Sequence, residues 1–218
     1  MLKYLPLGGS VPDMRGRRFV VTYLESLFQS SGSIQLMFSS STEANVIVTN
    51  SLYNIKANVL VPAGGTATLT FPVAIVPNYN QTMSIEKRAL YVESTSDVSV
   101  YAFNLCPWTS SSFAVMPIAA LGRRHFLASY GYAWGADFPM FSVAAVSNNT
   151  NVTIKFRVGN SGSCGTPSGG NQSIGDGDVH NFILDEFDVF TAYCSGDVTG
   201  TSVVSSKPLG VFSGHVAG

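Results

Sequence analysis

Charged residues are scarce in this chain of 218 residues. Asp, Glu, Lys and Arg make up 11% of it, against roughly 25% in an average soluble domain. The net charge is −1 and no basic run exceeds two residues, so the sequence predicts no nucleic-acid partner. Hydrophobic residues reach 45%, which supplies a core and leaves Ser, Thr, Asn and Gly for the surface. That composition is typical of secreted β-proteins, so we expect an extracellular location.

Long apolar runs are also missing. No stretch approaches the roughly 18 consecutive apolar residues of a membrane helix, so we expect no membrane insertion. Residues 1–14 contain two prolines and two adjacent glycines and are interpreted as a leader or linker. Their apolar run is too short for the hydrophobic region of a signal peptide. If the protein is secreted, its signal peptide is therefore expected outside this sequence.

Cysteine is rare and its count of three is odd. Cys164 lies in a polar, glycine-rich insertion at residues 159–178, and Cys194 follows the next predicted hairpin. From these positions we predict a Cys164–Cys194 disulfide, whose loop of about 30 residues would stabilise the fold by roughly 3–4 kcal/mol. Cys106 is then expected either to pair outside this chain or to be buried as a small hydrophobe.

Histidine, a common metal ligand and general base, is equally rare. His125, His180 and His215 are the three histidines, and none has a cysteine or second histidine at ligand spacing. Asp176, Asp178 and His180 alternate ahead of a second acidic cluster. A hydrolase or a calcium-dependent β-sandwich module with its site around these three residues is therefore the alternative interpretation.

The motifs of known sites disfavour that alternative. An EF-hand loop starting at Asp176 requires glycine at its sixth place and glutamate at its twelfth, where this chain has Asn181 and Phe187. There is no Gly-x-Ser-x-Gly nucleophile elbow and no glycine-rich phosphate loop. We therefore predict a protein that is not an enzyme, with no catalytic residue, no cofactor and no metal ligand.

Short alternating segments separated by turns dominate what is present. In residues 98–103, Val98, Val100 and Ala102 share one side, which is the two-residue period of a β-strand. Turn clusters such as residues 62–65 separate the segments. The pattern predicts seven short strands within roughly 90 residues.

The pattern is duplicated along the chain. Gly16-Arg17-Arg18 reappears as Gly122-Arg123-Arg124, and Asn45-Val46 as Asn151-Val152, each 106 positions later. The sequence therefore predicts an all-β fold of two tandem Ig-like antiparallel β-sandwich repeats. The alternative is a β-propeller fragment, although a propeller repeats every roughly 40–50 residues. The predicted parts are a leader or linker at 1–14, a first repeat at 15–105, a connector at 106–121 and a second repeat at 122–218.

One turn departs from the duplication. Phe187 stands in the second hairpin where Gly64 stands in the first. Because a positive φ is costly for a phenylalanine, we expect the second turn to have a different shape.

Aromatic residues gather around the connector. Trp108 and Trp134 lie in or beside it, and tryptophan is a typical anchor of protein interfaces. We predict them as partner-binding residues; the alternative is that the aromatic residues pack the two repeats together.

Four N-x-Ser/Thr sites fall in predicted turns or loops and are candidate glycosylation sites: Asn80, Asn148, Asn151 and Asn171.

Several segments resemble the N-terminal domain of the IgGFc-binding protein family. The resemblance is carried by DVSVYAFN at 97–104, AVMPIAALGRRHFLASYG at 114–131, NNTNVTI at 148–154 and DVTGTSVVSSKPLGVFSGH at 197–215. It implies a non-catalytic extracellular binding or adhesion module of a secreted mucus-type or cell-surface protein. The implied partners are proteins or glycoproteins, with immunoglobulin Fc and mucins as the named ones.

The resembling segments are strand ends and turns, so they identify the family and carry no Fc-contact residues. Members of the family often have a cysteine after the final Gly-His, where this chain has Val216-Ala217-Gly218. We therefore expect further domains of the same parent protein beyond residue 218.

Overall fold

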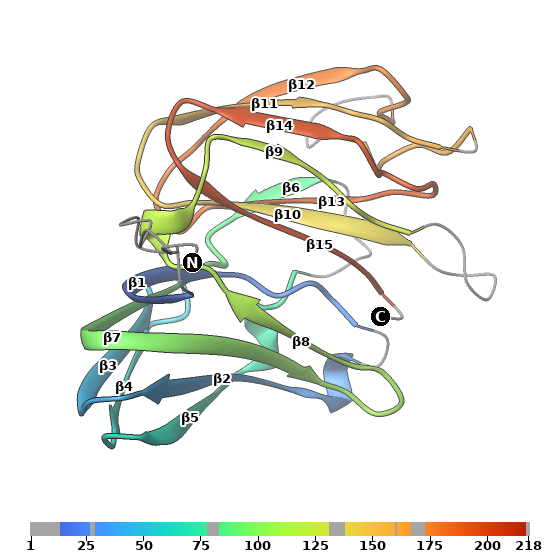
Figure 1. Ribbon diagram of the computed structural model, residues 1–218. Coiled ribbons are helices and arrows are strands. Elements are labelled where there is room, and N and C mark those ends of the chain that lie inside the picture. The colour runs from blue at the N-terminus through green and yellow to red at the C-terminus, as the bar shows by residue number, and fades with distance from the viewer. Residues whose placement is uncertain are drawn as a thin grey trace, which may run out of the picture.

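The computed structural model describes residues 14–26, 29–77, 83–130, 138–159, 161–166 and 173–216, and its strands form two stacked halves (Figure 1). These residues form fifteen β-strands and three short 3-10 helices, with no α-helix among them. The 3-10 helices span Gln29–Ser31, Val73–Ile75 and Ile118–Ala120. Within the described ranges, no helix is long and apolar enough to cross a membrane.

Seven strands form the first half, in the order β4-β3-β7-β2-β5 with β1 and β8 also paired to β7. Their bounds are β1 Arg15–Val21, β2 Ser33–Ser40, β3 Ala44–Asn50, β4 Ile55–Val61, β5 Gly65–Phe71, β7 Leu90–Leu105 and β8 Ser110–Val115. The 16-residue β7 pairs with β3 at its beginning and with β2 and β8 at its end. It therefore passes from one layer of the sandwich to the other.

Alternating burial explains why these segments form strands. Leu36 and Phe38 of β2 are fully buried, and their neighbours in the strand are half-buried. They share one core with Val46 and Val48 of β3, although β2 and β3 do not pair. The period-two pattern of the sequence thus places one face of each strand in a core between the layers.

Eight strands form the sheets of the second half, in the orders β15-β10-β13-β6 and β12-β11-β14-β9. Their bounds are β6 Ser84–Glu86, β9 Arg124–Phe126, β10 Pro139–Ala145, β11 Thr150–Lys155, β12 Val179–Leu184, β13 Val189–Tyr193, β14 Ser202–Ser205 and β15 Leu209–His215. Phe141 and Phe190 of one sheet share a buried core with Ile154 and Val203 of the other.

The predicted all-β antiparallel sandwich class is confirmed, because each half has two facing layers and not a single propeller blade. The neighbours β1-β7-β3-β4 and β7-β2-β5 in the first half match β9-β14-β11-β12 and β15-β10-β13 in the second. In an immunoglobulin domain the first strand lies in the same layer as the second and fifth strands. Here the first strand of each half, β1 or β9, lies in the opposite layer. The last strand, which is the end of β7 or β15, pairs instead with the second strand, β2 or β10.

The two halves are joined by more than the connector. β6 comes from within residues 15–105 but pairs with β13, with Ile85 opposite Phe190. A junction core, defined here as Val20, Ala89, Tyr91, Ala144, Val146 and Val189 with their packed neighbours, lies where the halves meet. The Tyr91 hydroxyl donates a hydrogen bond to the Ala145 carbonyl, and burial raises the pKa of this phenol.

The turn at Phe187 corrects one expectation. Phe187 has φ 70, the value that Gly64 has in the first half, so the expected difference in backbone shape is wrong. The Phe187 ring packs on Tyr91 with centroids 4.5 Å apart, and its carbonyl accepts the Ala89 N–H at 3.2 Å. Packing at the junction core therefore outweighs the cost of a left-handed phenylalanine.

Candidate partner-binding groove

A groove of about 390 Å³ lies between the two halves. One wall is β8 and the opposite wall is β15, and the end of β1 with the residues that follow it forms the base. Figure 1 shows β8 and β15 facing each other on the near side of the molecule, with the chain leaving β1 between them. The groove is thus built from three segments that are far apart in the sequence.

Aromatic rings from both halves form the inner surface of the groove. The ring of Phe113 on β8 contacts Phe212 on β15 edge-on, with centroids 5.7 Å apart. It also contacts Tyr23 from the base, at 6.3 Å. Tyr130 and His215 line the groove as well, with their rings stacked 4.9 Å apart. For Phe113, the alternative interpretation of the connector aromatics holds, because this residue packs the two halves together.

Two glycines let β15 approach the base closely. A Cβ atom at Gly214 would lie 2.8 Å from the Leu24 side chain, closer than real Cβ contacts come. A Cβ atom at Gly210 would lie 3.3 Å from Val20. A side chain at Gly214 would therefore displace the Leu24 side chain from the base, and one at Gly210 would crowd Val20.

A buried amide network anchors the β7–β8 hairpin to the base. The Gln29 amide nitrogen donates to Asn104 Oδ1 at 3.0 Å, and Asn104 Nδ2 donates to the Leu24 carbonyl at 3.0 Å. The hydroxyls of Ser26 and Thr109 are 2.6 Å apart and share a hydrogen bond. Sequence reasoning missed these residues because they come from separate segments and form no motif.

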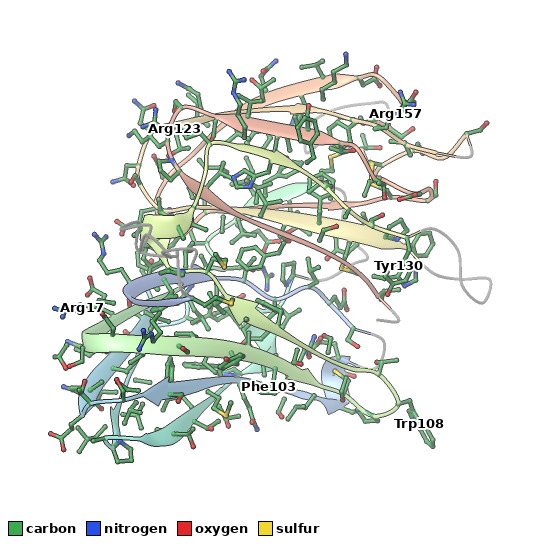
Figure 2. All side chains as sticks on the ribbon, viewed as in Figure 1. Arg17, Phe103, Trp108, Arg123, Tyr130 and Arg157 are labelled. Carbon is green, nitrogen blue, oxygen red and sulfur yellow. A yellow bond between two sulfur atoms is a disulfide. The ribbon has the colours of Figure 1, made fainter. Side chains whose placement is uncertain are left out.

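Trp108 stands at the tip of this anchored hairpin. Its side chain is 90% exposed and its φ is 70. Figure 2 shows it pointing away from the body of the protein, whereas Tyr130 lies on the other half at the same end of the molecule. Trp108 is thus an exposed aromatic group on a strained backbone, beside the groove. The second predicted residue, Trp134, lies outside the described residues.

The predicted Cys164–Cys194 disulfide is present. Of the two roles left open for Cys106, the structure shows the buried one. Cys164 and Cys194 form a disulfide with an S–S distance of 2.00 Å, and both are buried members of the second core. Cys106 is free and buried, and burial raises the pKa of its thiol. Its Sγ lies 3.3 Å from Asn104 Oδ1, so it belongs to the anchor of the hairpin.

Two of the four candidate glycosylation sites are described. Asn148 is exposed, and its Oδ1 accepts the Glu186 N–H at 2.9 Å. Asn151 is exposed in β11, opposite the exposed Ile183 of β12. Both are on the second half, away from the residues that line the groove. Asn80 and Asn171 lie outside the described residues.

The residues of the alternative hydrolase or calcium site have structural contacts. Asp176 Oδ1 accepts the Val158 N–H at 3.0 Å, and Asp178 Oδ2 accepts the Gly175 N–H at 2.8 Å. The His180 ring packs near the Phe182 and Phe190 rings, and burial lowers its pKa. Among the described residues, no three acidic, histidine or cysteine side chains gather in a metal-binding arrangement.

Comparison with known proteins adds three findings. Residues 111–218 match the family described as IgGFc binding protein, a range that contains nearly all of β8 and all of β15. A curated human protein named IgGFc-binding protein is 27% identical over 131 residues, which is 60% of this chain. The aligned region spans 2% of that relative's length. No solved structure matches this chain.

Proposed function

Since residues 111–218 of this chain belong to the IgGFc-binding protein family, we propose that it is a non-catalytic extracellular module that binds a protein or glycoprotein partner. The contact surface we propose is the groove between β8 and β15 together with Trp108. The module would belong to a mucus-type or cell-surface adhesion protein with further domains.

The exposed and strained Trp108 is the observation that carries this proposal. A non-glycine residue at φ 70 costs of the order of 1–3 kcal/mol, and such strain persists where the surroundings impose it. Contacts of Asn104 with Leu24 and of Thr109 with Ser26 hold the hairpin on both sides of Trp108. The 90% exposed ring gains no packing in return. A partner that buries the ring would supply that packing, as tryptophan anchors do at protein interfaces.

The proposed partner class follows from the surface and from the relative. No Lys or Arg lines the described part of the groove, whereas Phe113, Met116 and Phe212 do, which favours a partner surface without strong charge. The name of the human relative refers to immunoglobulin Fc. We therefore propose Fc as the first partner to test and mucin glycoproteins as the second.

The proposed extracellular location has two supports. The Cys164–Cys194 disulfide is of a kind that persists in oxidising compartments. Asn148 and Asn151 are exposed within N-x-Thr sequences, where glycans could be attached in the secretory pathway.

The proposal is tested by binding of the glycosylated 218-residue chain to immobilised Fc fragment and to purified mucin. We expect one of the two to bind, and Trp108→Ala to weaken that binding about 30-fold, as loss of about 2 kcal/mol at an anchor does. Phe126→Ala is the matched control, because Phe126 is 77% exposed on β9 and does not line the groove. Both variants should keep the melting temperature of the wild type.

Two results would count against the proposal. If the Trp108→Ala and Phe126→Ala variants bind equally strongly, Trp108 and the groove are not the contact surface. Failure of the chain to bind either probe would remove the proposed partner class.

A further inference from the structure

Resting on the proposed function, we infer that the groove binds an extended, uncharged peptide segment of the partner, which pairs its backbone with the free edge of β8. The segment would add a strand to the layer β8-β7-β2-β5. Alternate side chains of the segment would face the apolar base and β15. Main-chain hydrogen bonds would supply affinity and side-chain fit would supply selectivity, as in other cases of strand addition.

The first observation is which residues of β8 line the groove. Ser111, Ser112, Phe113 and Ala114 are consecutive, and all four line it. Successive side chains of a strand point to opposite faces, so a wall of four consecutive residues is the backbone edge of the strand. Among the described residues β8 pairs with β7 alone. Alternate N–H and C=O groups of β8 therefore point into the groove without a ladder partner.

The opposite wall is less available for pairing. Six consecutive residues of β15, from Gly210 to His215, also line the groove. However, the Leu209 N–H donates to the Gly122 carbonyl at 3.1 Å, and the Ser213 hydroxyl donates to the Ala128 carbonyl at 2.9 Å. The chain between residues 122 and 128 thus already contacts β15. We therefore assign the pairing to β8 and the side-chain contacts to β15.

The second observation is that the β8 edge is unprotected. Natural proteins usually block free strand edges with charge, proline, bulges or a covering segment. Ser110–Val115 contains no charged residue and no proline. Among the other end strands, β4, β6 and β9 carry a charged residue, namely Lys56, Glu86 and Arg124, whereas β5, β12 and β15 contain no Asp, Glu, Lys or Arg. β8 differs from β5 and β12 because its edge forms a wall of the groove, and from β15 because residues 122–128 already contact that strand. An open edge of six residues is long enough for a peptide strand of about 20 Å.

The third observation concerns charge and continuity. Among the described residues that line the groove, Glu25 carries the one carboxylate, and there is no Lys or Arg. An acidic segment is therefore disfavoured and a neutral one is favoured. Val20 and Phe212 line the groove and also pack in the junction core. A bound segment would thus extend an apolar interface that the protein already has between its halves.

The test begins with a random dodecapeptide library on phage, selected against the 218-residue chain, and a synthetic peptide made from the selected sequence. Ser112→Lys places a charge on the open edge, because Ser112 is exposed on β8. Thr68→Lys is the matched control, exposed on β5 at the other end of the same layer. We expect Ser112→Lys to weaken peptide binding at least tenfold and Thr68→Lys to leave it unchanged. Equal melting temperatures would show that both variants fold.

A scan of backbone N-methylation along the peptide sharpens the test. Strand addition predicts that methylation weakens binding tenfold or more at every second residue and has little effect between them. Amide hydrogen exchange should slow in residues 110–115 when the peptide is bound.

Other outcomes would overturn the inference. The inference fails if Ser112→Lys weakens the binding of no selected peptide. It also fails if the effect of N-methylation does not alternate along the peptide. A wild-type dimer in sedimentation velocity that Ser112→Lys converts to monomer would assign the β8 edge to a second copy of this chain. Trp108→Ala could weaken the binding of Fc or mucin while Ser112→Lys leaves it unchanged. In that case the proposed function stands and this inference fails.

Discussion

Phe187 and Trp108 are both aromatic residues at φ 70, in two regions that use this conformation differently. Phe187 lies in the turn between β12 and β13, where its ring packs on Tyr91 at the junction of the halves. Trp108 lies at the tip between β7 and β8, with a ring that is 90% exposed. The strain at Phe187 is offset within the fold, whereas the strain at Trp108 has no compensating packing. That difference separates a structural turn from a candidate contact point.

Gly64 gives the reference for both residues. It has φ 70 in the turn that corresponds to Phe187, and a Cβ atom there would meet nothing within 4 Å. The same backbone conformation therefore forms with a glycine or with a phenylalanine at this place. The second half has a phenylalanine at this place because the junction core surrounds it, while the first half exposes the same place to solvent.

The largest effect is expected from Phe187→Gly. Removing a partly buried phenyl ring costs roughly 3 kcal/mol, and relief of the left-handed conformation returns about 1 kcal/mol, so the free energy of unfolding should fall by about 2 kcal/mol. Urea denaturation followed by circular dichroism measures this. Phe187→Ala is the control that loses the ring and keeps the strain, and it should be about 1 kcal/mol less stable than Phe187→Gly. A Phe187→Gly protein as stable as the wild type would break the comparison.

A smaller effect is expected from Gly64→Ala. The added methyl group meets no neighbour, so the loss isolates the cost of a left-handed residue with a Cβ atom, about 1 kcal/mol. Thr66→Ala, at an exposed position of the same hairpin, should change the free energy of unfolding by less than about 0.5 kcal/mol. If Gly64→Ala is also neutral, strain cannot explain why Trp108 is unusual.

The smallest effect on stability is expected from Trp108→Gly, and it has the opposite sign. The exposed ring contributes no packing, so relief of strain should raise the free energy of unfolding by up to about 1 kcal/mol. Trp108→Ala keeps the Cβ atom and should match the wild type. The same urea experiment measures both variants. A clear loss of stability in Trp108→Gly would mean that the ring supports the fold, and the contrast with Phe187 would disappear.

The period-two alternation of β2 or β7, with turn residues between the strands, was enough to predict an antiparallel sandwich. This works because each strand buries one face whichever strand lies beside it. The positions of Cys164 and Cys194 pointed to their disulfide, because a polar insertion and the end of the next hairpin lie close in chain order. Composition also indicated a surface with little charge.

Long-range packing decided what the sequence could not. Alternation predicts which face of a strand is buried but does not determine which strands pair with it. The pairing of β6 with β13 and the exchanged layers of the first and last strands therefore had no local signal. The left-handed Phe187 contradicted its own propensity because Tyr91, distant in sequence, packs on it. The groove between β8 and β15 exists only because the two halves stack in this orientation. Local preferences are worth about 1 kcal/mol a residue, and at Phe187 the contacts between the halves outweigh them.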